Sequence, residues 1–217
     1  FKKGDVSMAR FYPYTFTDLE TWLKTIENKP FVEIQKPGFT QEGKPVYLIR
    51  ITDPETPSIN KKRIFMHART HSAEVPPSFL IEGLVNFLLS GSTEAAEILS
   101  DFEFYIFPMQ NVDGAIAGNY RSTPKSENLE MMWNYDFNNT LELIEGTPPE
   151  VTVIHQLAKN LMSDGGPRIT IALNLHSSNS EPETCPFFFP HFGSEANGYQ
   201  PAEAALWNNQ LRFINTL

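Results

Sequence analysis

Hydrophobic positions along the chain repeat with two different periods, and each period indicates one kind of element. Four apolar residues from Leu19 to Ile26 recur on one helical face behind a capping-box sequence that starts at Thr17, which predicts a helix over 17–28. Apolar runs of four to eight residues are typical of strands. Such runs predict strands over 31–35, 46–51, 63–66, 102–107 and 169–175, and the continuous last run predicts a fully buried strand.

Helical patterns separate these predicted strands. The run from Pro76 to Leu89 is apolar nearly all round, which predicts a buried helix that is opened by a proline pair. A short helical pattern covers 93–99, a longer one covers 148–164, and a third covers 201–217. Strands that alternate with helices predict an α/β fold, with a mostly parallel mixed sheet flanked by helices on both faces. We expect a single domain over 1–217 that is incomplete at its C-terminal end, because the chain stops inside a helical pattern.

Composition and charge narrow the class of protein. An apolar fraction of 41% in 217 residues is typical of one globular domain. The net charge of −9 argues against nucleic acid or an anionic membrane as partner, because binding to phosphates needs clustered Lys and Arg. Cys185 is the single cysteine, which excludes an internal disulfide and a cysteine-built zinc site. We expect a cytoplasmic protein and leave a secreted or periplasmic location open.

Candidate metal ligands follow two of the predicted strands. His71 and Glu74 come after the strand over 63–66, three residues apart, and His176 ends the strand over 169–175. Imidazole nitrogens and carboxylate oxygens are both good zinc donors. Ligands of α/β sheets bind beyond the carboxyl ends of strands, so these side chains are expected to share one site. His67 is an alternative ligand, although a packing role at the end of its strand is favoured.

Four motifs then stand in a fixed order: His71-x-x-Glu74, Asn111-Val112-Asp113-Gly114, Gly118-Asn119-Tyr120-Arg121 and a lone His176. In this order they resemble the zinc carboxypeptidases of the M14 peptidase family, and most of all its cytosolic carboxypeptidase branch. The resemblance extends from residue 5 to about residue 180.

The resemblance implies a zinc metallopeptidase. His71, Glu74 and His176 would be the three protein ligands of Zn²⁺ and would leave a fourth position for water. Arg121 would be catalytic, because it matches the arginine that stabilises the oxyanion of the tetrahedral intermediate. The implied reaction is hydrolysis of a C-terminal peptide or isopeptide-like amide bond, and the implied substrate is the C-terminal tail of a peptide or protein.

One departure from the family concerns the substrate terminus. Members carry a D-L-N-R-like motif whose Asn and Arg hold the terminal carboxylate, and the best match here is 136–139, which keeps Asn138 but has Asn139 in place of the arginine. An alternative register at 128–131 also lacks the arginine. Because an amide cannot make the charged fork that arginine makes, Arg69 is a candidate for the missing charge. The alternative is an amidase or deacylase that needs no free terminal carboxylate.

A second departure concerns the general base. In the family it is a Glu on a strand well downstream of the third ligand, and this chain ends 41 residues after His176 without a Glu that matches. We therefore expect the base beyond Leu217, together with near inactivity of residues 1–217 alone.

Besides Arg69, Arg121 is a second candidate for the positive charge that would hold the terminal carboxylate of a substrate. A third hypothesis is a non-catalytic member that keeps the fold and the zinc as a binding module.

Overall fold

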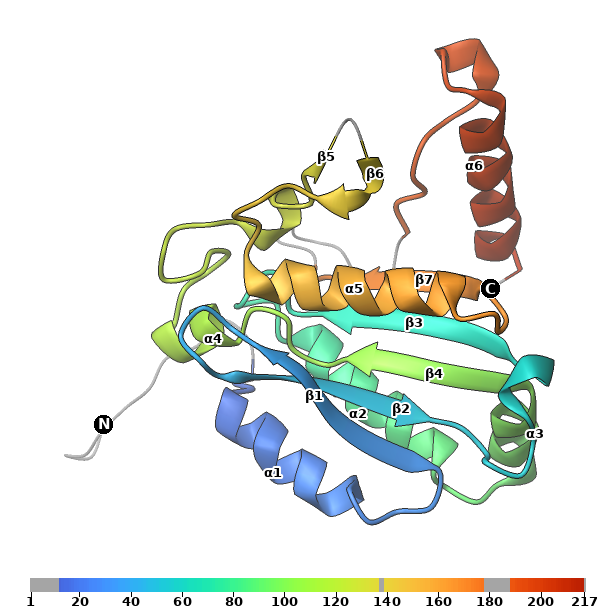
Figure 1. Ribbon diagram of the computed structural model, residues 1–217. Coiled ribbons are helices and arrows are strands. Elements are labelled where there is room, and N and C mark those ends of the chain that lie inside the picture. Colours follow the sequence, from blue (N-terminus) through green and yellow to red (C-terminus); the bar gives the residue numbers. More distant parts are fainter. Residues whose placement is uncertain (1–11, 137–138, 178–187, 217) are drawn as a thin grey trace. The chain divides into compact units, whose positions relative to one another are not determined.

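The structure is a computed structural model that describes residues 12–136, 139–177 and 188–216 (Figure 1). It divides into two compact units, Phe1–Ser177 and Ser178–Leu217. The single domain over 1–217 stays a prediction. No helix among the described residues is both long enough and apolar enough to span a membrane.

The first unit is built on a five-stranded mixed sheet with the order β1-β2-β4-β3-β7. The pairings β1–β2 and β2–β4 are antiparallel, whereas β3 pairs in parallel with both β4 and β7. Its strands are β1 (Val32–Phe39), β2 (Pro45–Ile51), β3 (Lys62–Ala68), β4 (Phe102–Phe107) and β7 (Ile169–Leu175). The structure thus confirms each predicted strand, and β4 lies at the centre of the sheet.

Helices cover both faces of this mixed sheet, which confirms the predicted α/β class, although its parallel and antiparallel pairings are equal in number rather than mostly parallel. A short antiparallel pair, β5 (Tyr135–Asp136) with β6 (Asn139–Leu143), lies outside the main sheet. The described helices are α1 (Phe16–Ile26), α2 (Pro76–Leu88), α3 (Thr93–Asp101), α4 (Val112–Ala117), α5 (Pro149–Ser163) and α6 (Pro201–Ile214). The part of the chain that the structure describes also contains 3₁₀ turns: η1 (Ser58–Asn60) between β2 and β3, η2 (Leu129–Met131) between α4 and β5, and η3 (Glu195–Asn197) before α6.

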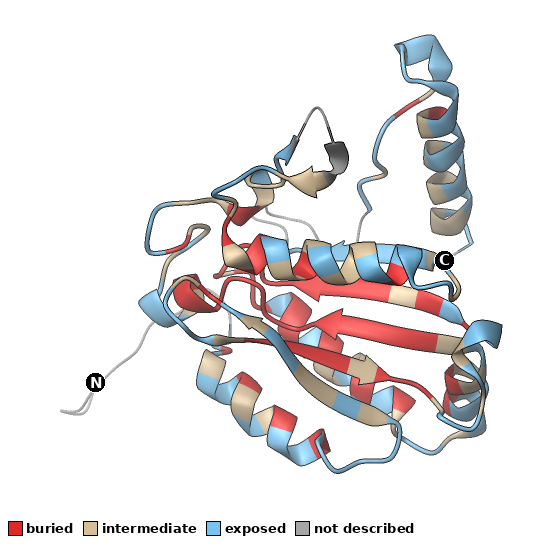
Figure 2. Cartoon of the chain, in the orientation of Figure 1, coloured by how far each residue is buried: buried red, intermediate tan, exposed pale blue. Residues whose placement is uncertain are grey.

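Two hydrophobic cores form because successive strand residues point to opposite faces of the sheet. From β2, Ile49 and Ile51 join a core with α1, α2 and α3, while Val46 and Leu48 join a second core with α5. As a result, β2, β3 and β4 are buried along almost their whole length, as Figure 2 shows. The sheet is thereby fixed between its helices, and the carboxyl ends of β3 and β7 are held in place.

Two predictions about burial are wrong. The strand β7 is not fully buried: its residues alternate between intermediate and exposed, because among the described residues it lies at the edge of the sheet and pairs with β3 alone. The helix α2 buries only one side, and Leu80 on the other side is 53% exposed. A continuous apolar run gives no sign of which side is covered, so periodicity could not separate these cases.

The start of α1 also differs from the sequence interpretation. The N-cap is Thr15 rather than Thr17, and it forms a reciprocal capping box with Asp18. The Thr15 hydroxyl accepts from the Asp18 amide at 3.1 Å, and the Asp18 carboxylate accepts from the Thr15 amide at 2.7 Å. Thr15 has an extended backbone, which an N-cap residue requires, and the helix therefore begins at Phe16.

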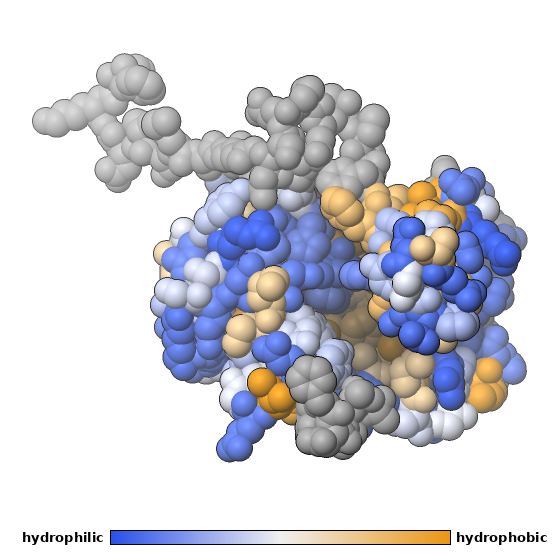
Figure 3. Space-filling view, turned by 90° about the horizontal axis from the view of Figure 1, so that it is seen from above, coloured by the Kyte–Doolittle hydropathy of each residue, from blue (hydrophilic) through white to orange (hydrophobic). Residues whose placement is uncertain are grey.

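The second unit contains η3 and α6. Gln200 caps α6, and the Glu203 carboxylate accepts from the Gln200 amide at 2.8 Å. Phe188 packs edge-on against Phe213 within this unit. The helix predicted over 201–217 is confirmed as far as Ile214. Hydrophilic residues predominate among the described atoms on the face shown in Figure 3.

Candidate metal centre

The loop between β3 and α2 carries two of the three predicted ligands. It starts at Arg69, whose backbone adopts the left-handed conformation with φ of 60° and turns the chain sharply after the strand. The Ser72 hydroxyl then donates to the Asn119 carbonyl at 2.7 Å, and the Ala73 amide donates to the Tyr120 carbonyl at 3.0 Å. The loop is therefore tied at Ser72 and at Ala73 to the segment that precedes Arg121.

Parallel pairing of β3 with β7 brings in the third ligand. Ala68 and Leu175, the last residues of the two strands, are partners in register. His176 follows β7 directly, and His71 follows β3 after a short turn. Both imidazoles consequently lie beyond the carboxyl ends of adjacent strands, where ligands of such sheets bind.

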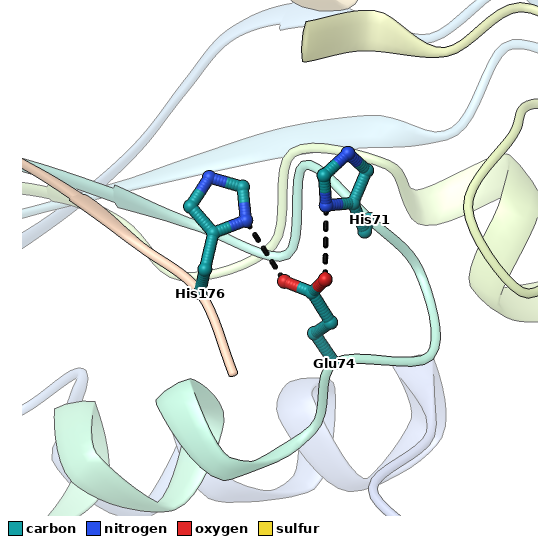
Figure 4. Close-up of side chains that lie close together, drawn as sticks. All are labelled: His71, Glu74 and His176. Carbon is teal, nitrogen blue, oxygen red and sulfur yellow. Dashed lines mark hydrogen bonds and ion pairs between the residues drawn. The ribbon is translucent and has the colours of Figure 1, made fainter. Parts of the chain in front are cut away.

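The three predicted ligands converge on one another (Figure 4). Glu74 lies between the two rings: its Oε1 is 3.0 Å from Nδ1 of His71, and its Oε2 is 2.8 Å from Nδ1 of His176. One donor atom from each residue lies within 4.8 Å of the other two. Two imidazole nitrogens and a carboxylate are the donor set of a catalytic zinc site, so these residues fit Zn²⁺ with one coordination position left open.

The charges of this group are coupled. Burial tends to raise the pKa of Glu74, but hydrogen bonds from His176 and His71 outweigh it and lower the pKa to about 2. Burial likewise tends to lower the pKa of His176, yet the carboxylates of Glu130 and Glu74 raise it to about 9. Before any metal binds, the site therefore holds a carboxylate that is balanced by a protonated imidazole. A divalent cation would replace that proton.

Arg121 stands beside the ligands. Its Nη2 lies 2.9 Å from Nε2 of His71, and its Nη1 lies 3.5 Å from Oε1 of Glu74. Its side chain is 41% exposed, so it borders the open side of the site rather than the core. The guanidinium is thus placed where it can bind an oxygen that develops negative charge near the metal.

The sequence around α4 explains how Arg121 reaches this position. Asn111 caps α4 by accepting from the Gly114 amide at 2.9 Å, and its amide group donates to the Arg121 carbonyl at 3.4 Å. A Cβ at Gly114 would come within 2.5 Å of the Ser122 carbonyl, so only glycine allows this approach. Asp113 and Gly114 thus belong to the first part of α4, and Asn111 helps to place Arg121.

Besides Arg121, two further side chains among the described residues contact the outward nitrogens of the histidines, and sequence reasoning missed both. Asn128 Oδ1 lies 3.1 Å from Nε2 of His71, and Glu130 Oε2 lies 3.3 Å from Nε2 of His176. Both belong to the alternative register of the D-L-N-R-like motif, at 128–131, which fits the sequence pattern less well. The capping residue Asn128, whose side chain accepts from the Glu130 amide at 3.1 Å, indicates a turn here, but no local signal indicates its contacts with the histidines.

The predicted substrate-binding residues have different placements. Asn138 lies outside the described residues, and Asn139 begins β6 with Asp136 as its backbone partner. Their role stays a prediction. Arg69 is buried, and its guanidinium donates to the carbonyls of Ser72 and Tyr14 and to the Ser78 hydroxyl. These contacts favour a role in holding the ligand loop.

His67 lies on β3 beneath the site. Burial lowers its pKa to about 4, and its Nδ1 lies 3.2 Å from Oε1 of Gln110. It does not belong to the group formed by His71, Glu74 and His176. The structure therefore gives His67 the packing position that the sequence favours over a ligand role.

Comparison with known proteins points to one family. The family model for zinc carboxypeptidases, peptidase M14, matches residues 19–180. Human cytosolic carboxypeptidase 2 is 38% identical over 128 residues, which cover 56% of this chain and 14% of that protein. Cytosolic carboxypeptidase 6 of Caenorhabditis elegans is 32% identical over 163 residues, which cover 69% of this chain and 36% of that protein.

A solved structure agrees with these sequence matches. A metallo-carboxypeptidase from Burkholderia cenocepacia superimposes with a TM-score of 0.65 and 25% identity, covering 76% of this chain and 42% of that chain. In each of these comparisons, the chain spans less than half the length of the protein that it matches. The matched region nevertheless includes the whole sheet and all three candidate ligands.

Proposed function

This chain belongs to the M14 zinc carboxypeptidase family, and from that premise we propose that its site serves zinc-dependent hydrolysis of a C-terminal peptide or isopeptide-like amide bond. The substrate is the C-terminal tail of a peptide or protein. The observation that carries the proposal is the convergence of two imidazole Nδ1 atoms on the Glu74 carboxylate, with Arg121 beside them. Bound zinc supplies a water of lowered pKa, ~7, and polarises the carbonyl to be attacked.

The residues of the chain have separate tasks in this proposal. His71, Glu74 and His176 hold the ion. The contacts of Ser72 and Ala73 hold the loop that carries His71 and Glu74. Arg121 binds the carbonyl oxygen and stabilises the negative charge that develops on it. Its partial exposure supports this role, because a substrate can reach a group at the open side of the site.

A second candidate is an amidase or deacylase of the same fold, and one observation favours it. The acidic Glu130 stands 3.3 Å from His176, and the neighbouring Met131 is 71% exposed. The register that contains them, 128–131, offers no cation for a terminal carboxylate. An ionised Glu130 would repel such a carboxylate, since like charges this close to a shared site are unfavourable.

Paired substrates test both candidates on the full-length protein loaded with zinc. Each peptide is offered once with a free C-terminal carboxylate and once with a C-terminal amide, and the products are followed by mass spectrometry. A carboxypeptidase removes residues only from the free acid, whereas an amidase or deacylase cleaves the amide at least as fast. Cleavage that survives Arg121→Ala undiminished would contradict the assigned catalytic role. Zinc binding without cleavage of either series would indicate a non-catalytic binding module.

We also propose a cytoplasmic location. Support comes from the names of the relatives, which are cytosolic carboxypeptidases, and from the single cysteine, Cys185. Fractionation of cells that express the full-length protein tests it, and recovery in a secreted or membrane fraction would contradict it.

A further inference from the structure

The 3₁₀ turn η2 carries an acidic side chain to the edge of the candidate metal centre. Glu130 contacts His176 through Nε2, the ring nitrogen that points away from Glu74. Asn174 holds the same carboxylate from the other side: its amide nitrogen donates to Oε1 at 3.1 Å and to Oε2 at 3.0 Å. Glu130 is therefore held by Asn174, which lies on β7, and by His176, which directly follows β7.

A metal ion at this site requires one particular tautomer of His176. Since Nδ1 is the nitrogen that faces Glu74, Nδ1 must offer its lone pair to the metal, and the ring proton must then lie on Nε2. A proton on Nε2 needs an acceptor, and the Glu130 carboxylate, which lies 3.3 Å from Nε2 as an ion pair, is placed to supply one. A carboxylate that accepts from a ligand imidazole fixes the orientation of the ring and increases its basicity.

We propose that Glu130 is a positioning residue that holds His176 in the orientation and tautomer needed to bind zinc, and that Asn174 in turn holds Glu130. This inference rests on the proposed zinc site. The geometry argues against Glu130 as a fourth ligand, because it is absent from the group of donor atoms that His71, Glu74 and His176 form among the described residues. It also argues against Glu130 as the general base, because Glu130 faces the nitrogen of His176 that points away from the metal.

Zinc affinity, measured by competition with a chromophoric chelator, tests the proposal on the purified protein. Loss of a carboxylate partner of a ligand imidazole typically weakens metal binding by about 10–100-fold, and we expect this loss in Glu130→Ala. Glu130→Gln keeps an oxygen acceptor without the charge, so a smaller loss is expected. Glu145→Gln is the matched control, because Glu145 is an exposed carboxylate of the same charge, and its zinc affinity should equal that of the wild type.

Nitrogen NMR of the histidine rings provides a readout that a merely structural role would not move. In the zinc-loaded wild type, His176 should carry its proton on Nε2 with Nδ1 bound to metal, and in Glu130→Ala this signature should broaden or split. If Glu130→Ala binds zinc with an affinity within twofold of the wild type, only this inference is overturned, and not the proposed function. A loss above about a thousandfold would overturn it in favour of direct ligation, since that exceeds what an outer partner contributes. A wild type that binds no zinc would overturn the proposed function as well.

Discussion

The structure gives Arg69 a different role from the one that the sequence predicts. The sequence makes Arg69 a candidate for binding a substrate carboxylate. In the structure, however, its guanidinium is buried and donates to the Ser72 carbonyl, the Tyr14 carbonyl and the Ser78 hydroxyl, at 3.0, 3.2 and 2.9 Å. These contacts join the ligand loop to the segment before α1 and to the first turn of α2. We therefore predict that Arg69→Met destabilises the fold.

The size of the effect follows from those contacts. Hydrogen bonds from a charged donor to buried acceptors contribute about 1.5–3 kcal/mol each. Burial of the charge opposes them, as the lowering of the pKa of Arg69 to about 10 indicates. A net loss of about 3 kcal/mol is expected once this desolvation is subtracted at about 1.4 kcal/mol per pKa unit. Methionine keeps the packing of the aliphatic stem, so the loss reports mainly on the guanidinium.

Urea unfolding followed by circular dichroism measures this loss on the metal-free protein. The control is Arg121→Met, whose side chain is 41% exposed and which should cost less than about 1 kcal/mol. Arg69→Lys should fall between the two, because an ammonium cannot reproduce the planar fork that reaches three acceptors. The reasoning is refuted if Arg69→Met unfolds within about 1 kcal/mol of the wild type. Loss of binding to carboxylate-ended substrates in that stable variant would restore the role expected from sequence.

Further predictions concern the metal and pH. Asn128→Ala removes the acceptor beside Nε2 of His71, and the zinc dissociation constant should rise by about tenfold in a chelator competition; an unchanged constant would contradict this role. His176 has a pKa raised to about 9, so zinc must displace its proton at lower pH. The apparent dissociation constant should thus fall about tenfold per pH unit between about pH 7 and 9, and a flat profile would be incompatible with this displacement. Burial raises the pKa of Glu150. A carboxyl group whose pKa is raised in the folded protein stabilises the fold most at pH values below its pKa in the unfolded chain, ~4.3. This stabilisation is lost as the pH rises through the pKa of the folded state. Glu150→Gln should abolish this loss in urea midpoints measured across that range, and an unaltered pH profile would count against the effect.

Local periodicity predicted most of the fold because each element has a pattern of its own. The residues that alternate along β2 divide between two cores, and the apolar face of α1 is buried against the sheet. The burial of β7 was not predictable, because a continuous apolar run reads the same in the middle of a sheet and at its edge. The exposed side of α2 has the same cause, since Leu80 is as apolar as the buried Ile81.

The candidate ligands were predictable because strand ends and side-chain chemistry are both local features. His71 and Glu74 are close in the chain, and the parallel pairing of β3 with β7 brings His176 to them. Glu130 was not predictable, since its contact with His176 spans 46 residues and depends on the path of the loop that holds η2. The direction of the Arg69 side chain was hidden too, because it follows from the left-handed turn that the backbone makes there.

Zinc content is the measurement that tests the proposed site most directly. After dialysis against trace zinc, elemental analysis of the purified wild type should give about one ion per chain, as a three-ligand site requires. His71→Ala, Glu74→Ala and His176→Ala should each bring the content close to zero, while His155→Ala, which alters a histidine of α5, should leave it unchanged. Full zinc occupancy in any of the three ligand variants, or none in the wild type, would contradict the assignment.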